Sequence, residues 1–197
     1  MIKAEILLLT AGKSSRMGQP KALLSIKGQP LISYQINRLK ELGLPITVVL
    51  GAYADAISKV VTSKEVRLDL NKDFEKGMGS SIAFGTNSIR NTNPEIDAIL
   101  VCAIDQPLVP LDHFENLLST ASKTDFSIIQ SLSEAGWRGI PTLFKSNHFE
   151  ALSKLSGDEG AKSIIQNNRS MVKAVEAPAD SLIDIDTYEQ YQSLNLD

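Results

Sequence analysis

The chain has 197 residues, which suits one domain, and its apolar (43%) and charged (22%) fractions are those of an ordinary globular protein. The net charge of −3 argues against bulk binding to nucleic acid, and no apolar stretch approaches the roughly 20 residues of a membrane span. The first residues lead straight into an apolar run, so we expect no signal peptide, and the one cysteine, Cys102, lies inside another such run. We therefore expect a single domain over 1–197 in the reducing cytoplasm, with neither nucleic acid nor membrane as a partner.

Apolar strand patterns alternate with amphipathic helix patterns along the chain. In chain order, the predicted elements are a strand at 6–9, a helix at 30–42, a strand at 47–50, a helix at 54–61, a strand at 66–70, a helix at 80–89, a strand at 98–104, a helix from 112, strands at 126–130 and 142–144, helices at 148–155 and 160–166, a strand at 171–175 and a helix at 187–194. The segment 89–96 is polar and predicts a surface loop, whereas Asp112 with Glu115 favours a capping-box start. This order predicts a Rossmann-like three-layer α/β/α sandwich with a mostly parallel sheet.

The segment after the first predicted strand carries the densest functional signal. Residues 7–24 read LLLTAGKSSRMGQPKALL, where an apolar run leads into a loop with two glycines, two serines and three cations. Backbone N–H groups beside glycine and cations such as Arg16 and Lys21 are typical of polyphosphate sites. The loop is not a Walker A motif, because Lys21 comes third after Gly18 instead of directly after it. It is not a dinucleotide fingerprint either, because Gly12 and Gly18 lie too far apart.

Carboxylates that could hold a metal ion occur at two other places in the sequence. Asp105 follows the apolar segment 98–104 directly, where it either holds a metal ion or makes an Asx turn before Pro107. Asp184 and Asp186 are two residues apart, so in an extended chain both point to the same side. Both could address one Mg²⁺, or one could cap the following helix.

Two glycine-containing turns precede predicted helices. The segment 77–81 (GMGSS) presents backbone N–H groups and two hydroxyls, or is a plain helix start with Ser80 as the N-cap. The segment 157–162 (GDEGAK) places acidic residues in a first helical turn, which the helix dipole also favours. His113 and His148 lie at predicted helix starts without a partner pattern, so we expect surface residues rather than metal ligands or a catalytic dyad.

Together these residues predict nucleotidyl transfer. Arg16 and Lys21 can bind a triphosphate, and Asp105 with Asp184 or Asp186 can hold Mg²⁺ together with phosphate oxygens. The reaction would be an in-line attack on the α-phosphorus with pyrophosphate as the leaving group. Catalysis would come from positioning and charge neutralisation rather than from a protein nucleophile.

In their order along nearly the whole chain, these motifs resemble those of the molybdenum cofactor cytidylyltransferases. This family belongs to the MobA-like nucleotidyltransferases, whose folds are related to glycosyltransferase A. The matching positions are Leu9, Ala11, Gly12, Ser14, Arg16, Met17, Gly18 and Lys21; Asn71, Gly77, Met78, Ser80 and Ser81; Asp105, Gln106 and Pro107; Gly139, Ile140 and Pro141; Gly157, Asp158, Gly160 and Ala161; and Asp184, Ile185, Asp186 and Thr187.

The resemblance implies transfer of CMP from CTP to the phosphate of molybdopterin, with Mg²⁺ as cofactor and a transient contact with a molybdenum hydroxylase or its chaperone. The implied nucleotide-binding residues are Leu9, Thr10, Ala11, Gly12, Ser14, Arg16, Lys21, Gly77, Met78, Ser80, Ser81 and Asp105. Arg16, Lys21 and Asp105 are also the implied catalytic residues. The implied pterin side comprises Gln106, Pro107, Gly139, Pro141, Gly157, Asp158, Gly160 and Lys162, and the implied metal ligands are Asp105, Asp184 and Asp186.

Ala11 favours CTP over GTP. Related guanylyltransferases carry glycine at this position, and a methyl group restricts the approach of a purine to the backbone. Lys162, Tyr188 and Gln190 depart from the family pattern, which has arginine, proline and an acid there. Lys162 keeps the charge of arginine but loses its planar fork.

Two other functions stay open at this point. One is a sibling nucleotidyltransferase that uses GTP, a sugar phosphate or another phosphorylated acceptor. The other is a non-catalytic maturation factor that carries the cofactor to a molybdenum hydroxylase. The presence of Asp105, Asp184 and Asp186 favours catalysis over carriage.

Overall fold

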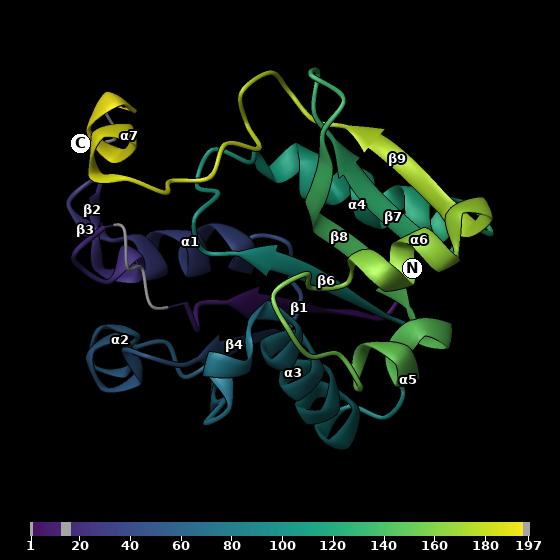
Figure 1. Ribbon diagram of the computed structural model, residues 1–197, viewed down its shortest axis with the longest axis horizontal. Helices are drawn as coiled ribbons and strands as arrows, with labels where there is room; N and C mark the ends of the chain where they lie inside the picture. Colours follow the sequence, from purple (N-terminus) through teal and green to yellow (C-terminus); the bar gives the residue numbers. More distant parts are fainter. Residues whose placement is uncertain (1, 13–16, 195–197) are drawn as a thin grey trace.

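The computed structural model describes residues 2–12 and 17–194. The strands of its central sheet are β1 (Ala4–Leu9), β4 (Ile46–Leu50), β5 (Val66–Leu70), β6 (Ala98–Ala103), β7 (Ile128–Leu132), β8 (Arg138–Lys145) and β9 (Val172–Glu176). They are ordered β5-β4-β1-β6-β8-β7-β9, and every neighbouring pair is parallel except the two that involve β8 (Figure 1). The predicted mostly parallel sheet is therefore confirmed, with 66–70 as an edge strand.

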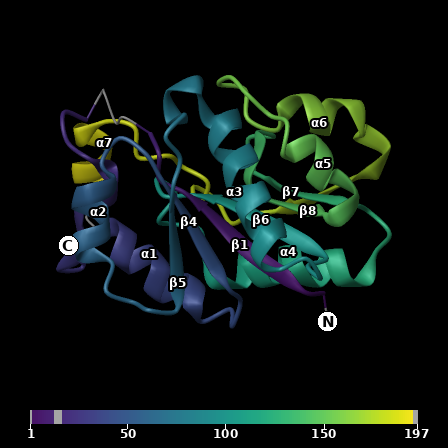
Figure 2. The ribbon, with the colours of Figure 1, turned by 90° about the horizontal axis from the view of Figure 1, so that it is seen from below.

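Helices cover both faces of this sheet. The helices are α1 (Leu31–Lys40), α2 (Ala54–Val60), α3 (Met78–Thr92), α4 (Leu111–Lys123), α5 (Phe149–Leu152), α6 (Lys162–Asn167) and α7 (Tyr188–Ser193). Figure 2 shows α1 and α4 on one side of the sheet and α3, α5 and α6 on the other. In the described part of the chain, no helix is long and apolar enough to cross a membrane.

Strand β1 shows why the sequence forms three layers. Its side chains are buried on both faces, as expected for a continuous apolar run in a parallel sheet. Ile6 and Leu8 join the core that includes α1, α2 and α4, whereas Leu7 and Leu9 join the core that includes α3, α5 and α6. Because successive strand residues point to opposite faces, one short apolar run packs against both helical layers.

The short hairpin of β2 (Ser25–Ile26) and β3 (Gln29–Pro30) was not predicted, because two-residue strands carry no periodic pattern. It lies beside α7 at the other end of the chain (Figure 1). The Tyr191 hydroxyl of α7 donates to the Ser25 carbonyl at 2.5 Å. The last helix is thereby held against the segment that follows the glycine-containing loop after β1.

Helix α3 corrects two predictions. It continues to Thr92, so the first part of 89–96 is helical rather than a loop, because Ile89 belongs to its buried face. At the other end, Gly77 occupies the N-cap position with φ of 92°, a conformation that favours glycine. Ser80 instead lies within the first turn, where its hydroxyl donates to the Gly77 carbonyl at 2.8 Å.

The prediction that the two histidines are surface residues is wrong, because both are buried. His113 in α4 is 1% exposed and its Nε2 lies 2.8 Å from Ser131 Oγ. His148, which precedes α5, is 5% exposed and its Nε2 lies 2.7 Å from Ser127 Oγ. Burial lowers the pKa of both imidazoles because the charged form loses its hydration. A serine hydroxyl on β7 or just before it gives each buried ring a hydrogen-bond partner, and no pattern in the linear sequence indicates these partners.

The start of α4 also differs from the predicted capping box. The helix begins at Leu111, directly after Pro110 as the N-cap residue, and no side chain caps it. Asp112 therefore lies inside the first turn, where a carboxylate still favours the helix dipole. A capping box does form at α7, where Thr187 and Gln190 bond reciprocally.

Candidate active site

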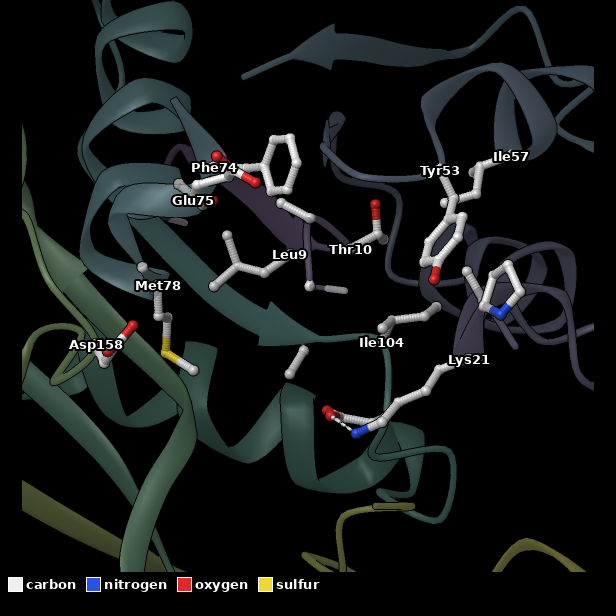
Figure 3. A pocket seen from close by; sticks show the side chains of 18 of the residues that line it. Leu9, Thr10, Lys21, Tyr53, Ile57, Phe74, Glu75, Met78, Ile104 and Asp158 are labelled. Atoms are coloured by element: carbon white, nitrogen blue, oxygen red, sulfur yellow. Dashed lines mark hydrogen bonds and ion pairs between the residues drawn. The ribbon is translucent and has the colours of Figure 1, made fainter. Parts of the chain in front are cut away.

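The candidate site lies where β1 and β6 end side by side. The chain leaves β1 toward β4 on one side and later returns as β6 on the other, so the loops after Leu9 and Ala103 diverge at this point. Such a switch in strand order opens a crevice at the carboxyl ends of the strands. A first pocket of about 570 Å³ occupies this crevice (Figure 3).

Most residues assigned to nucleotide binding line this first pocket. Those that do are Leu9, Thr10, Ala11, Gly12, Lys21, Gly77, Met78, Ser81 and Asp105. Ser80 does not, because its hydroxyl is turned back to backbone carbonyls. Ser14 and Arg16 lie outside the described residues.

The residues of the first pocket that the motifs did not indicate include Tyr53, Ile57, Phe74 and Glu75. Figure 3 shows the rings of Tyr53 and Phe74 on different sides of the pocket. Tyr53 directly precedes α2, and Phe74 begins the 3₁₀ turn Phe74–Lys76. Neither segment has a motif, so only the position of these turns beside the strand ends could have indicated them.

Lys21 forms the charged centre of the first pocket. Its Nζ donates to Asp105 Oδ2 at 2.9 Å and to Asp186 Oδ1 at 2.7 Å. The backbone is tied at the same place, since the Ile185 N–H donates to the Asp105 carbonyl at 2.9 Å. Burial alone lowers the pKa of Lys21, but the charges and hydrogen bonds of the two aspartates outweigh it and raise that pKa.

Asp184 lies on the other side of Asp105. Asp186 lines the first pocket, Asp184 lines a second one, and Asp105 lines both. The alternation of an extended chain predicted one shared side for the pair, whereas the structure places the two carboxylates on adjoining pockets. Burial, followed by the charge of Asp105, raises the pKa of Asp184 to about 6, and a hydrogen bond from Gln106 opposes this shift.

The carboxylates do not make a complete metal site by themselves. Within 2–12 and 17–194, no three His, Cys, Asp or Glu side chains are grouped so that they could hold a metal ion. Mg²⁺ commonly takes only one or two carboxylates and completes its shell with phosphate oxygens and water. Asp105 and its neighbours offer hard oxygen ligands that fit such a partial site, and the charge of Asp105 adds to burial in raising the pKa of Asp184.

The second pocket has a volume of about 650 Å³ and shares Met78, Ala103, Asp105 and Asp158 with the first. Of the residues assigned to the pterin side, Gln106, Gly139, Asp158, Gly160 and Lys162 line it. Pro107, Pro141 and Gly157 do not. The residues missed by the sequence analysis include Gln130, Trp137, Arg138 and Arg169.

The two glycine turns singled out in the sequence pack against each other between the pockets. The Gly79 N–H donates to the Gly157 carbonyl, and the Gly157 N–H donates to the Lys76 carbonyl, both at 2.8 Å. A Cβ at Gly77 would overlap the Gly157 carbonyl and the Asp158 carboxylate. Close backbone approach, as well as the positive φ, therefore requires glycine at position 77.

Comparison with known proteins decides the family. The family model described as the MobA-like NTP transferase domain matches residues 6–174. The chain belongs to this family. The family places it among the nucleotidyltransferases.

Relatives of this MobA-like transferase cover almost all of its length. The purine catabolism protein PucB of Bacillus subtilis (strain 168) is 31% identical over 93% of this chain and 91% of its own. The nicotine blue oxidoreductase of Paenarthrobacter nicotinovorans is 30% identical over 95% and 94%. Rv0371c from Mycobacterium tuberculosis H37Rv shares the fold with a TM-score of 0.83 at 23% identity, over 98% of this chain and 97% of that chain. Another structure of Rv0371c is a complex with manganese.

In this MobA-like transferase, helix α1 fixes the loop that carries Asp105. Arg38 donates from Nη1 to the Pro107 carbonyl at 2.8 Å and from Nη2 to the Val109 carbonyl at 2.6 Å. Gln35 donates to the Gln106 carbonyl at 3.1 Å. Pro107, which lines neither pocket, thus takes part in holding the loop.

Proposed function

We propose that this protein transfers CMP from CTP to the phosphate of molybdopterin, forming the cytosine dinucleotide cofactor and pyrophosphate. The observation that carries the proposal is the pair of adjoining pockets with Asp105 in their shared wall. Transfer between two substrates requires that both are held next to one charged centre. Lys21, Asp184 and Asp186 surround Asp105 and supply this charge. A carrier would need only one of the two pockets.

The first pocket would hold CTP. The glycine-containing loop from Ala11 and the cation of Lys21 suit its phosphates, as does Arg16. Ala11 is buried and packs so tightly on Gly51 that a Cβ on Gly51 would overlap it. Ala11 lines the first pocket, and so closely packed a backbone has little room to shift away from a larger base, which supports the smaller pyrimidine.

Asp105, with Asp184 or Asp186, would hold Mg²⁺ together with phosphate oxygens. When bound there, Mg²⁺ would neutralise the triphosphate and the charge that develops on the leaving pyrophosphate. The carboxylates of this chain hold that charge in place, and Lys21 keeps a cation beside them. The manganese complex of Rv0371c supports a divalent cation in this fold.

The second pocket would hold molybdopterin, with its phosphate toward Asp105 and the first pocket. Lys162 on the pocket wall would contribute the cation assigned to the pterin side. We further propose that the protein acts in the cytoplasm and meets a molybdenum hydroxylase or its chaperone transiently when the product is handed over.

The decisive experiment measures pyrophosphate release from CTP, Mg²⁺ and molybdopterin by the wild-type protein and by Asp105→Asn. We expect release by the wild type and its loss in the variant, with the far-UV circular dichroism spectrum unchanged. Full activity of Asp105→Asn would contradict the metal assignment. Binding of molybdopterin without any pyrophosphate release would favour the maturation factor instead.

Thermal melting with each nucleotide tests the choice of base. We expect CTP with Mg²⁺ to raise the melting temperature more than GTP with Mg²⁺, because a ligand stabilises the folded state according to its affinity. Stabilisation by GTP alone would overturn the cytidylyl assignment and favour the sibling transferase. Ala11→Gly is the matched variant, and its preference for CTP should decrease.

A further inference from the structure

The second pocket contains a large aromatic residue that no motif assigned. Trp137 lies in the loop between β7 and β8 and lines the pocket, yet 47% of the residue is exposed. An indole left half in solvent at the wall of a cavity offers a wide apolar face that a ligand can cover. The loop holds it there, because the Trp137 N–H donates to Ser133 Oγ at 3.0 Å and the Trp137 carbonyl accepts from the Ser133 N–H at 2.8 Å.

The indole of Trp137 packs against the backbone of Gly139. A Cβ placed on Gly139 would overlap the six-membered part of the Trp137 ring, so the ring lies directly against the glycine backbone. Any larger residue at this position would displace the ring from the pocket wall. The φ of Gly139 is not positive, so the absence of a side chain serves this contact rather than a turn.

Two buried amides face the same cavity. Gln106 is 3% exposed and Gln130 is 5% exposed, and both line the second pocket. Gln106 donates through Nε2 to the Leu182 carbonyl at 3.4 Å, while its Oε1 has no hydrogen-bond partner among the described residues. A buried acceptor without a donor is costly, so it indicates a ligand that brings an N–H group.

We propose that Trp137 is the specificity residue of the second pocket and stacks on a flat heteroaromatic ring whose N–H edge meets Gln106. This rests on the proposed function only in taking the second pocket as the acceptor site. An aromatic face and a buried amide acceptor that line the same pocket select a fused, nitrogen-containing ring over a sugar of similar size. Stacking of a heterocycle on an aromatic side chain strengthens binding by roughly tenfold or more.

Trp137 is the only tryptophan of the chain, so its fluorescence reports on the second pocket alone. We expect a pterin phosphate to quench this fluorescence saturably and glycerol phosphate to leave it unchanged. Absence of saturable quenching would overturn the proposal. The measurement needs neither CTP nor turnover, so its result stands whether or not the proposed transfer occurs.

Kinetics of the transfer separate a binding role from a structural one. Trp137→Leu should raise KM for molybdopterin by about tenfold, leaving kcat and KM for CTP unchanged, and Trp137→Phe should restore most of the loss. Gly139→Ala should reproduce the defect because it displaces the indole. Leu70→Ala is the control, since Leu70 is also 47% exposed but lines neither pocket. An unchanged acceptor KM in Trp137→Leu would overturn the proposal while the cytidylyl transfer remains.

Discussion

Lys21 shows how one side chain balances the charge of the site. Its ammonium bridges Asp105 and Asp186, whose carboxylates otherwise repel each other and Asp184. The side chain of Lys21 is largely buried, so solvent screens these interactions less than at the surface. At the residue scale, the ammonium and carboxylate groups proposed to bind substrate and metal are therefore also the groups that hold the site together.

Replacing this ammonium with an apolar group should weaken the fold as well as the activity. We expect Lys21→Met to lower the free energy of unfolding at neutral pH by about 1–2 kcal/mol, because it leaves partly buried carboxylates without their cation. Urea denaturation measures the change. Lys154→Met, which removes a fully solvated pair with Glu150, is the control and should cause no measurable loss. Equal losses in both variants would contradict this account.

Helix α1 acts at the scale of an element. Through Gln35 and Arg38 it holds the loop after Asp105 at three points, namely the carbonyls of Gln106, Pro107 and Val109. The sequence predicts α1 only as an amphipathic helix of the sandwich. Its polar side chains nonetheless set the position of the carboxylate shared by the two pockets.

Arg38→Met should reduce kcat for pyrophosphate release by about tenfold to a hundredfold, because a small displacement of Asp105 disturbs the alignment of the substrates. Arg38→Lys should stay impaired, since lysine keeps the charge but cannot reach two carbonyls with a planar fork. Lys40→Met on the same helix is the control, as Lys40 pairs with Glu65 away from both pockets. Wild-type kcat in Arg38→Met would show that the clamp does not position Asp105.

At the scale of the whole molecule, the buried histidines link stability to pH. The unfolded chain protonates His148 with an ordinary pKa near 6.5, whereas burial lowers this pKa in the folded state. The unfolded state therefore binds more protons below that value. Stability is full above about pH 6.5 and decreases as the pH falls below it.

We expect His148→Gln to lose less stability than the wild type on acidification. The difference in the free energy of unfolding between pH of about 7.5 and about 5.5 should shrink by about 1 kcal/mol in the variant. Asp184 titrates in the opposite sense, because its raised pKa makes the folded state hold a proton, but it is present in both proteins and cancels in the comparison. Parallel pH profiles from urea denaturation would contradict the assignment to His148.

The sequence by itself determined the order of elements, the mostly parallel sheet and the places where functional loops leave the strands. Periodicity encodes these features, because the period of apolar residues reports local conformation and the number of buried faces. The motif order also sufficed to indicate the family. The burial of the histidines and the true start of α3 were not predicted, because tertiary packing and backbone φ angles produce no periodic pattern in the sequence.

Only the tertiary structure decided which side chains meet. Lys21 lies 84 residues from Asp105 and 165 from Asp186, and the strand order together with the packing of the segment before α7 brings the three together. The same holds for the two glycine turns packed between the pockets, for the Arg38 clamp and for Trp137 on the wall of the second pocket. Contacts between distant segments depend on how the layers close over the sheet, a property of the packed core that no local pattern contains.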